Sequence, residues 1–227
     1  MTTILITGAG RGIGYELARQ SIDKGWNVIG SVRSVEAQRE LAQKLPQMAV
    51  LNFDVTDHAA IEKVANAFHS PIDVLVNNAG IIGPATDAQT TLEMDFDGFA
   101  KTLETNVLSP LKIAQVFLPL LKQGNNPRLI NISSKMGRME FSASDRIAYR
   151  ASKAALNKVT QALATDLKEE GISCISMHPG WVQSDMGGAQ ADISPEQSAK
   201  GILQVISSLT IGDTGKFIDW DGIARSW

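Results

Sequence analysis

Apolar residues follow two alternating patterns along this chain of 227 residues. Short apolar runs predict strands, and longer segments in which apolar residues recur every three or four positions predict helices. The runs cover residues 2–7, 27–32, 48–53, 72–76, 128–132, 172–177 and 215–218. The helical segments cover residues 12–24, 35–45, 57–68, 96–121, 147–170 and 199–209.

Strands that alternate with helices of this length indicate parallel β-α-β units, with helices on both faces of one sheet. No linker rich in Pro, Gly or Ser divides the chain. We therefore expect a single doubly wound α/β domain over residues 1–227, with a mostly parallel seven-stranded sheet.

Composition narrows the classes of function. A formal net charge of −3 supplies no basic field for nucleic acid, and no apolar run approaches the roughly 20 residues that span a bilayer. Met1 leads directly into the first strand, without a basic segment or a long apolar stretch, so we expect a cytoplasmic protein. Cys174 is the only cysteine, which excludes an intrachain disulfide, and we expect no metal site.

A glycine-rich turn follows the first predicted strand, where residues 7–14 read TGAGRGIG. Glycines at such a turn let the backbone approach a pyrophosphate, and the N-terminus of the next helix supplies N–H donors. Turns are rich in glycine in any case, but this position between strand and helix favours a Rossmann-type dinucleotide site. The expected contacts are Gly8, Gly10, Arg11, Gly12, Ile13 and Gly14.

The end of the second strand indicates which dinucleotide binds. A carboxylate there would bind the ribose 2′-hydroxyl of NAD, whereas an arginine suits the 2′-phosphate of NADP. Arg33 stands at this place and no acid occurs before Glu36. Either Arg33 or Arg11 alone can be ordinary surface charge, but together they predict NADP(H) in preference to NAD(H).

Polar residues also follow the third and fourth strands. After the third strand, Asp54, followed by Val55, can accept a hydrogen bond from the adenine amino group. After the fourth strand, Asn78 precedes Ala79 and Gly80, whose small size leaves room for the expected cofactor. For each of these segments, ordinary turn chemistry is an equally good explanation.

Tyr149 and Lys153 lie one turn apart at the start of the helix predicted over residues 147–170. Residues four apart share a helix face, so the phenol and the ammonium can meet. A nearby cation is expected to lower the tyrosine pKa from about 10 toward neutrality, which suits a general acid. Taken alone, the pair also fits a solvated surface helix.

Five motifs, TGAGRGIG, NNAG, NISS, YRASK and HPG, occur in this order at the predicted strand ends. Together they resemble the short-chain dehydrogenase/reductase family over essentially the whole chain. The segments HPGWVQSDMGG and GKFIDWDG are similar to the branch of the C-factor-like proteins and sniffer-type carbonyl reductases. The resemblance implies Asn106, Ser134, Tyr149 and Lys153 as catalytic residues. Tyr149 would protonate the substrate oxygen, Ser134 would bind it, and Lys153 would also bind the nicotinamide ribose.

Two details of the catalytic set stay open in the sequence. Ser133 competes with Ser134, because Tyr149 follows Ser134 by 15 residues, more than is common in the family. We attribute the difference to an insertion in the loop 138–146, which we expect to alter the wall of the substrate pocket rather than the chemistry. Asn106 stands four residues before Pro110, which has no N–H, so the Asn106 carbonyl is free to hold a water for a proton relay. A proline kink without function is the alternative.

The loop after the sixth strand is implied by the same resemblance to hold the nicotinamide. Its expected contacts are Pro179, Gly180, Val182 and Ser184. His178 is expected to be structural, and the sequence does not assign Trp181 to substrate or to packing. Met186, Gly187 and Gly188 are expected to form a short lid, which favours an open pocket with loose selectivity.

The resemblance thus implies an NADPH-dependent oxidoreductase that reduces an aldehyde or ketone to an alcohol. It also implies a small-molecule carbonyl or alcohol as substrate and a homodimer or homotetramer as the assembly. The alternative is a dinucleotide-binding signalling or scaffold protein of the C-factor type, with little or no turnover.

Overall fold

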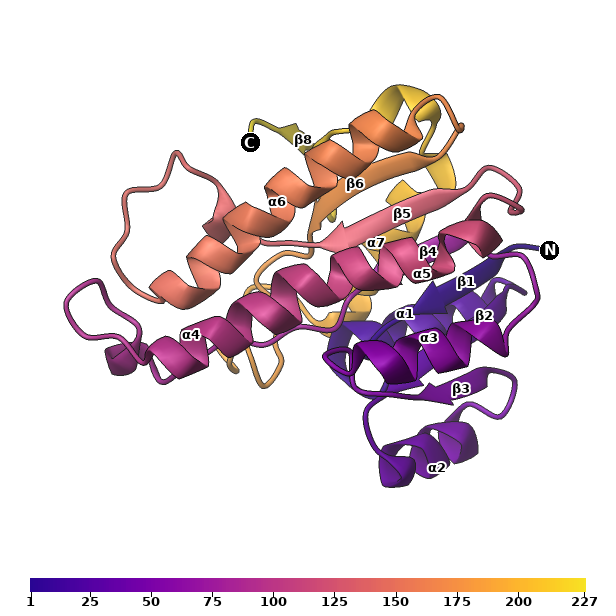
Figure 1. The fold of residues 1–227 in the computed structure, drawn as a ribbon, viewed down its shortest axis with the longest axis horizontal. Coiled ribbons are helices and arrows are strands. Elements are labelled where there is room, and N and C mark those ends of the chain that lie inside the picture. The colour runs from indigo at the N-terminus through magenta and orange to yellow at the C-terminus, as the bar shows by residue number, and fades with distance from the viewer.

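An eight-stranded sheet runs through the computed structural model, which describes residues 1–227, in the order β3-β2-β1-β4-β5-β6-β7-β8 (Figure 1). All neighbouring strands are parallel except β7 and β8. The strands are β1 Thr3–Ile6, β2 Asn27–Val32, β3 Ala49–Asn52, β4 Val74–Asn77, β5 Arg128–Ile132, β6 Ser173–His178, β7 Phe217–Asp219 and β8 Ala224–Arg225. The predicted doubly wound α/β fold is confirmed.

Helices cover both faces of the sheet (Figure 1). The α-helices are α1 Gly12–Asp23, α2 Val35–Lys44, α3 His58–Asn66, α4 Phe96–Leu103, α5 Ser109–Leu121, α6 Ile147–Leu167 and α7 Pro195–Ser208. A π-helical turn, Glu104–Leu108, joins α4 to α5, and short 3₁₀ turns lie at Thr86–Ala88, Lys135–Gly137 and Ile211–Asp213. No helix combines the length and the apolar character that crossing a membrane requires.

The alternation of side chains along β1 divides the core into two layers. Ile4 and Ile6 belong to a layer that includes Leu17 of α1 and Ile202 of α7. Leu5, between them, belongs to the other layer, which receives residues of α3, α5 and α6. Because both faces of the sheet are covered, its strands are apolar throughout, which is why they appear in the sequence as continuous runs.

The structure corrects the predicted elements in three places. The sheet has an eighth strand, β8, because residues 224–225 fold back antiparallel to β7. The helix predicted over residues 96–121 is divided by the π-helical turn. Helix α7 begins at Pro195 rather than at residue 199, because Ser194 and Gln197 form a reciprocal capping box there.

The chain leaves β1 toward β2 and β3 on one side, and β4 continues the sheet on the other side of β1. Ligands of open α/β sheets bind at such a switch point, beyond the carboxyl ends of the strands. The loops after β1, β4, β5 and β6 meet at that edge.

Candidate active site at the carboxyl edge of the sheet

The glycine turn after β1 has the backbone shape that a pyrophosphate requires. Gly8 and Gly12 adopt positive φ angles of 68° and 55°, which side chains disfavour. A Cβ atom at Gly14 would overlap the carbonyl oxygen of Gly8. No side chain caps α1, whose N-cap is Arg11, so the first-turn N–H groups are open to an anion. These residues fit the phosphates of a dinucleotide.

The turn after β4 locks the glycine turn in place. Thr7 Oγ1 accepts from the backbone N–H groups of Asn78 and Ala79 at 3.0 and 3.1 Å. The Asn78 side-chain amide donates to the carbonyl oxygens of Thr7 and Gly8 at 2.9 and 3.2 Å. Asn78 therefore orients the phosphate loop, and Ala79 and Gly80 follow it along the same edge.

The residues expected at the adenosine end lie at the surface. Arg33 is exposed directly after β2 and forms no ion pair. Arg11 forms an exposed ion pair with Asp185 rather than standing free beside Arg33. Asp54 accepts from the N–H and hydroxyl of Thr56 at 2.9 and 2.8 Å, which is the turn chemistry that the sequence left as an alternative. Val55, the next residue, is half-buried.

Helix α6 brings Tyr149 to the wall of a cavity of about 130 Å³ at this edge and places Lys153 one turn further along the helix. Both side chains are almost fully buried, with 8% and 5% of their surface exposed. Lys153 Nζ donates to the Ile132 carbonyl oxygen at 2.8 Å and lies 5.7 Å from the centroid of the Tyr149 ring. Tyr149 and Ser134 line the cavity together.

The two serines after β5 differ in their surroundings. The Ser133 hydroxyl donates to Asn157 Oδ1 at 2.6 Å, inside the packing between α6 and the sheet. The Ser134 hydroxyl accepts only from the backbone N–H of Met136, at 3.1 Å, and its side chain neighbours the Tyr149 phenol. Of the two serines, Ser134 is therefore the one whose hydroxyl is left free beside the Tyr149 phenol.

Asn106 lies in the π-helical turn and uses its whole side chain to hold the loop after β4. Its amide donates to the Ile81 carbonyl at 2.8 Å and to the Ser152 hydroxyl at 3.0 Å, and its Oδ1 accepts from the Ile81 N–H at 2.9 Å. Any role toward Lys153 therefore falls to the Asn106 backbone carbonyl. A π-helical turn is frequent at functional sites, and here it ends two residues before Pro110.

The pKa values of the pair differ from the expectation. Burial raises the pKa of Tyr149 to about 12, an effect opposed in part by the Ser134 hydroxyl and the Arg146 guanidinium. Burial also lowers the pKa of Lys153 to about 8. The prediction that Lys153 holds the tyrosine pKa near neutrality is wrong for the protein alone, because removal from water disfavours both charged forms.

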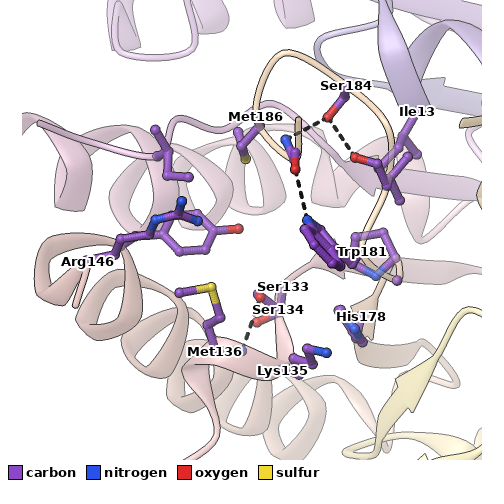
Figure 2. Close-up of a pocket in the computed structure, with 16 residues that line it drawn as sticks. Ile13, Ser133, Ser134, Lys135, Met136, Arg146, His178, Trp181, Ser184 and Met186 are labelled. Carbon is purple, nitrogen blue, oxygen red and sulfur yellow. Dashed lines mark hydrogen bonds between the residues drawn. The ribbon is translucent and has the colours of Figure 1, made fainter. Parts of the chain in front are cut away.

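The loop after β6 forms a braced flap over the cavity (Figure 2). Trp181 Nε1 donates to the Gly187 carbonyl at 2.9 Å, while the Ser184 hydroxyl donates to the Val182 carbonyl and accepts from the Gly187 N–H, each at 3.2 Å. Gly180 has a φ angle of 88°. The Pro179 carbonyl accepts from Ser198 of α7 at 2.6 Å, which ties the flap to that helix.

Sequence reasoning missed several residues that line the cavity. They are Ile82, Lys135 and Met136. The adjacency of Lys135 to Ser134 was a visible signal. Arg146, at the end of the loop 138–146, and Met186 and Gly187, in the short lid, line the cavity as expected. His178 also lines the cavity, and burial lowers the pKa of its imidazole to about 4, so that it stays neutral. No group of three or more His, Cys, Asp or Glu side chains is placed to hold a metal ion.

The lowered pKa of Lys153 predicts a pH-dependent stability of the protein without added nucleotide. Between about pH 8 and the ordinary lysine value of 10.5, the unfolded chain binds this proton more tightly, so the free energy of unfolding rises with pH by up to about 3 kcal/mol. Lys153→Met removes this contribution, whereas Lys158→Met, at an exposed site on α6, retains it.

Urea unfolding of the three proteins between pH 7 and pH 10 measures the effect. We expect Lys153→Met to be more stable than wild type at pH 7 and the difference to shrink toward pH 10. Burial raises the pKa values of Cys174 and Tyr149, which produces the opposite slope at higher pH in all three proteins. A difference that is constant with pH would contradict the assigned pKa.

Comparison with known proteins agrees with this geometry. Among curated proteins, the chain is 38% identical to the C-signal of Myxococcus xanthus over 163 residues, which covers 71% of this chain and 96% of that protein. It is 30% identical to 1-hydroxy-2-glutathionyl-2-methyl-3-butene dehydrogenase of Rhodococcus sp. (strain AD45), with 100% of each chain covered.

Two solved structures share the fold over the full length. Carbonyl reductase Sniffer of D. melanogaster matches with a TM-score of 0.92 and 32% identity, covering 100% of both chains. The NADPH-bound carbonyl reductase from chicken fatty liver matches with a TM-score of 0.90 and 32% identity, covering 100% of this chain and 99% of that one. The family model described as short chain dehydrogenase matches residues 2–194, and the chain therefore belongs to the short-chain dehydrogenase family of oxidoreductases.

Proposed function

We propose that this oxidoreductase reduces an aldehyde or ketone to an alcohol with NADPH as cofactor. The observation that carries the proposal is that Tyr149 and Ser134 line one cavity beside the glycine turn, with Lys153 buried one helical turn from Tyr149. Two similar solved proteins are carbonyl reductases by name, which supports the same reaction class.

The residues of the chain handle the substrate oxygen and its proton. NADPH, when bound, supplies the hydride. Ser134 Oγ donates a hydrogen bond to the substrate carbonyl and orients it. Tyr149, with a pKa of about 12, holds its proton at neutral pH and delivers it from Oη to the developing alkoxide, a stronger base. Lys153 then stabilises the phenolate as a nearby cation.

The proton that Tyr149 loses must be replaced from solvent. Lys153, with a pKa of about 8, exchanges protons readily near neutral pH. We propose that a water on the Asn106 backbone carbonyl connects it to solvent, because Pro110 has no N–H to occupy that carbonyl in helical geometry.

The cofactor would lie across the switch point. The proposed contacts with its phosphates, adenosine and nicotinamide ribose are Gly8, Gly10, Arg11, Gly12, Ile13, Gly14, Arg33, Asp54, Val55, Asn78, Ala79, Gly80, Tyr149 and Lys153. Pro179, Gly180, Val182 and Ser184 would hold the nicotinamide. The preference for NADP rests on the unpaired Arg33 and is supported by the NADPH in the chicken enzyme and the NADP bound to a similar Burkholderia multivorans protein. On binding the cofactor, Arg11 would leave Asp185 and bind phosphate instead. Breaking the ion pair with Asp185 costs little free energy, because both side chains are exposed.

A signalling or scaffold role that needs only nucleotide binding is the second candidate, because the C-signal is among the similar proteins. A cytoplasmic homodimer or homotetramer remains our expectation for either role. The exposed Phe96, at the start of α4, and Leu108, at the end of the π-helical turn, offer apolar surface for such an assembly.

Tyr149→Phe should lower kcat for carbonyl reduction by about 10²- to 10⁴-fold, because the phenylalanine has no proton to donate. Turnover of a panel of aldehydes, diketones and quinones with NADPH measures the loss, and NADPH binding followed by its fluorescence is the control for folding. Wild-type protein that binds NADPH but turns over no member of the panel would favour the signalling role.

Arg33→Ala should reduce the preference for NADP over NAD by about tenfold or more, because a charge-assisted bond to the 2′-phosphate is lost. Dissociation constants of the two cofactors measure the preference. Arg39→Ala, at an exposed arginine of α2, is the matched control. An unchanged preference in Arg33→Ala would defeat the assignment.

Pro110→Ala should slow proton delivery, because the new N–H can bond the Asn106 carbonyl and displace the proposed water. We expect a lower kcat and a larger solvent isotope effect. Pro119→Ala restores an N–H in the same helix at a site facing the Gln115 carbonyl, and serves as the control. Equal kinetics in wild type and Pro110→Ala would count against the relay.

A further inference from the structure

The cavity beside Tyr149 has an unbalanced charge. Of the 16 residues that line it, two are cations, Lys135 and Arg146, and none is an aspartate or glutamate. This occurs in a protein whose formal net charge is −3. His178 adds no charge, because burial lowers the pKa of its imidazole to about 4. The cavity therefore favours an anion electrostatically.

Arg146 stands where neither backbone nor helix favours it. It is the N-cap of α6, in the left-handed conformation with φ 50° and ψ 45°, and its side chain caps nothing. A cation at a helix N-terminus opposes the helix dipole, and left-handed backbone is unfavourable for a long side chain. The neighbouring carboxylate compensates only in small part, because Asp145 forms its ion pair with Arg150, at 2.8 Å, and none with Arg146. Such a strained residue in a cavity wall is characteristic of a functional position.

Lys135 is the second cation without an ion pair. It follows Ser134 directly and lines both the first cavity and an adjoining one of about 500 Å³. The arginines of the adjoining cavity are neutralised, Arg138 by Glu140 and Arg225 by Asp219, each at 2.8 Å. Lys135 has no carboxylate within ion-pair distance in either cavity.

Both cations lie away from the phosphate end of the site. Figure 2 shows Ile13, next to the glycine turn, at the upper right of the cavity, Arg146 at its left and Lys135 below. The pyrophosphate that the glycine turn would bind does not account for two cations on the opposite side. Met136 and Trp181, which also line the cavity, provide apolar surface for the body of a substrate.

We propose that the substrate is a carbonyl compound carrying a carboxylate, which Arg146 and Lys135 bind while its carbonyl meets Tyr149 and Ser134. The inference rests on the proposed reductase function and names the substrate class of that same site. Arg146 and Lys135 are then specificity-determining residues. An aldehyde acid should be preferred over its neutral ester, because only the acid supplies the missing negative charge.

The test uses matched pairs of substrates with the full-length protein and NADPH. The pairs are 3- and 4-carboxybenzaldehyde and their methyl esters, which differ in charge at the same ring position. Arg146→Asn removes the cation with a residue that tolerates the left-handed backbone, and Arg146→Lys retains the charge. Lys135→Gln tests the second cation, and Lys158→Gln on the exposed face of α6 is the control.

We expect the kcat/KM of wild type to be about tenfold or more higher for at least one acid than for its ester. Arg146→Asn should lower kcat/KM for that acid by about ten- to a hundredfold, mainly by raising KM. The ester should change much less, Arg146→Lys should retain part of the preference, and Lys135→Gln should reduce it. The absence of any preference in wild type would overturn the inference. So would equal losses for acid and ester in Arg146→Asn, which would mean that Arg146 acts only through Tyr149.

Binding separates this inference from the reductase proposal. Tryptophan fluorescence titrations with each acid and ester, in the presence of NADP, report binding without turnover. Tighter binding of the acid, weakened in Arg146→Asn, supports the carboxylate site even if no carbonyl is reduced. Turnover of both compounds without preference leaves the reductase standing and refutes the carboxylate site. If the protein neither binds nor turns over any of these compounds, both proposals are refuted.

Discussion

The hydrogen bond from Lys153 Nζ to the Ile132 carbonyl, at 2.8 Å, joins the candidate active site to the sheet. It ties α6 to the carboxyl end of β5 and places Tyr149, one turn earlier, at the cavity. The bond is made by an almost fully buried ammonium group, so it is strong in a surrounding of low dielectric. Burial disfavours the charged lysine at the same time, which lowers its pKa to about 8. The burial of Lys153 thus determines both where Tyr149 and Lys153 lie and how readily Lys153 loses its proton.

Small residues let three loops converge around this lysine. A Cβ atom at Gly137 would come within 2.6 Å of the Lys153 carbonyl carbon, and one at Gly80 would lie 3.1 Å from Asn106 Oδ1 and 3.7 Å from Lys153 Nζ. Asn106 then bonds both the N–H and the carbonyl of Ile81. The loop after β4, the π-helical turn and the 3₁₀ turn after β5 are therefore positioned by contact with one another. A substitution in any of these three segments is therefore expected to shift the position of the Lys153 side chain.

The sequence predicted what local patterns encode. The strands, most helices, the glycine turn and the Tyr149–Lys153 spacing could all be found, because each depends on residues close together in the chain. The two-residue strand β8 is too short to leave a pattern. The ion pair between Arg11 and Asp185 joins residues 174 positions apart, so no local pattern predicts it. The Tyr149 pKa depends on burial, which the spacing of residues in the sequence does not reveal. The loop 138–146 was expected at the pocket wall, but only the structure identifies Arg146 as the residue of that loop that lines the cavity.

The protonation of the pair bears on the choice between an enzyme and a nucleotide-binding signal protein. Burial that lowers the pKa of Lys153 from 10.5 to about 8 costs the folded state stability at neutral pH, whereas a methionine would fill the same space without that cost. Nucleotide binding alone needs no buried phenol beside this lysine. A proton donor and its resupply need both groups, and a buried lysine that lowers stability beside such a donor is characteristic of a catalytic site. The cost of burying Lys153 therefore supports chemistry over binding alone.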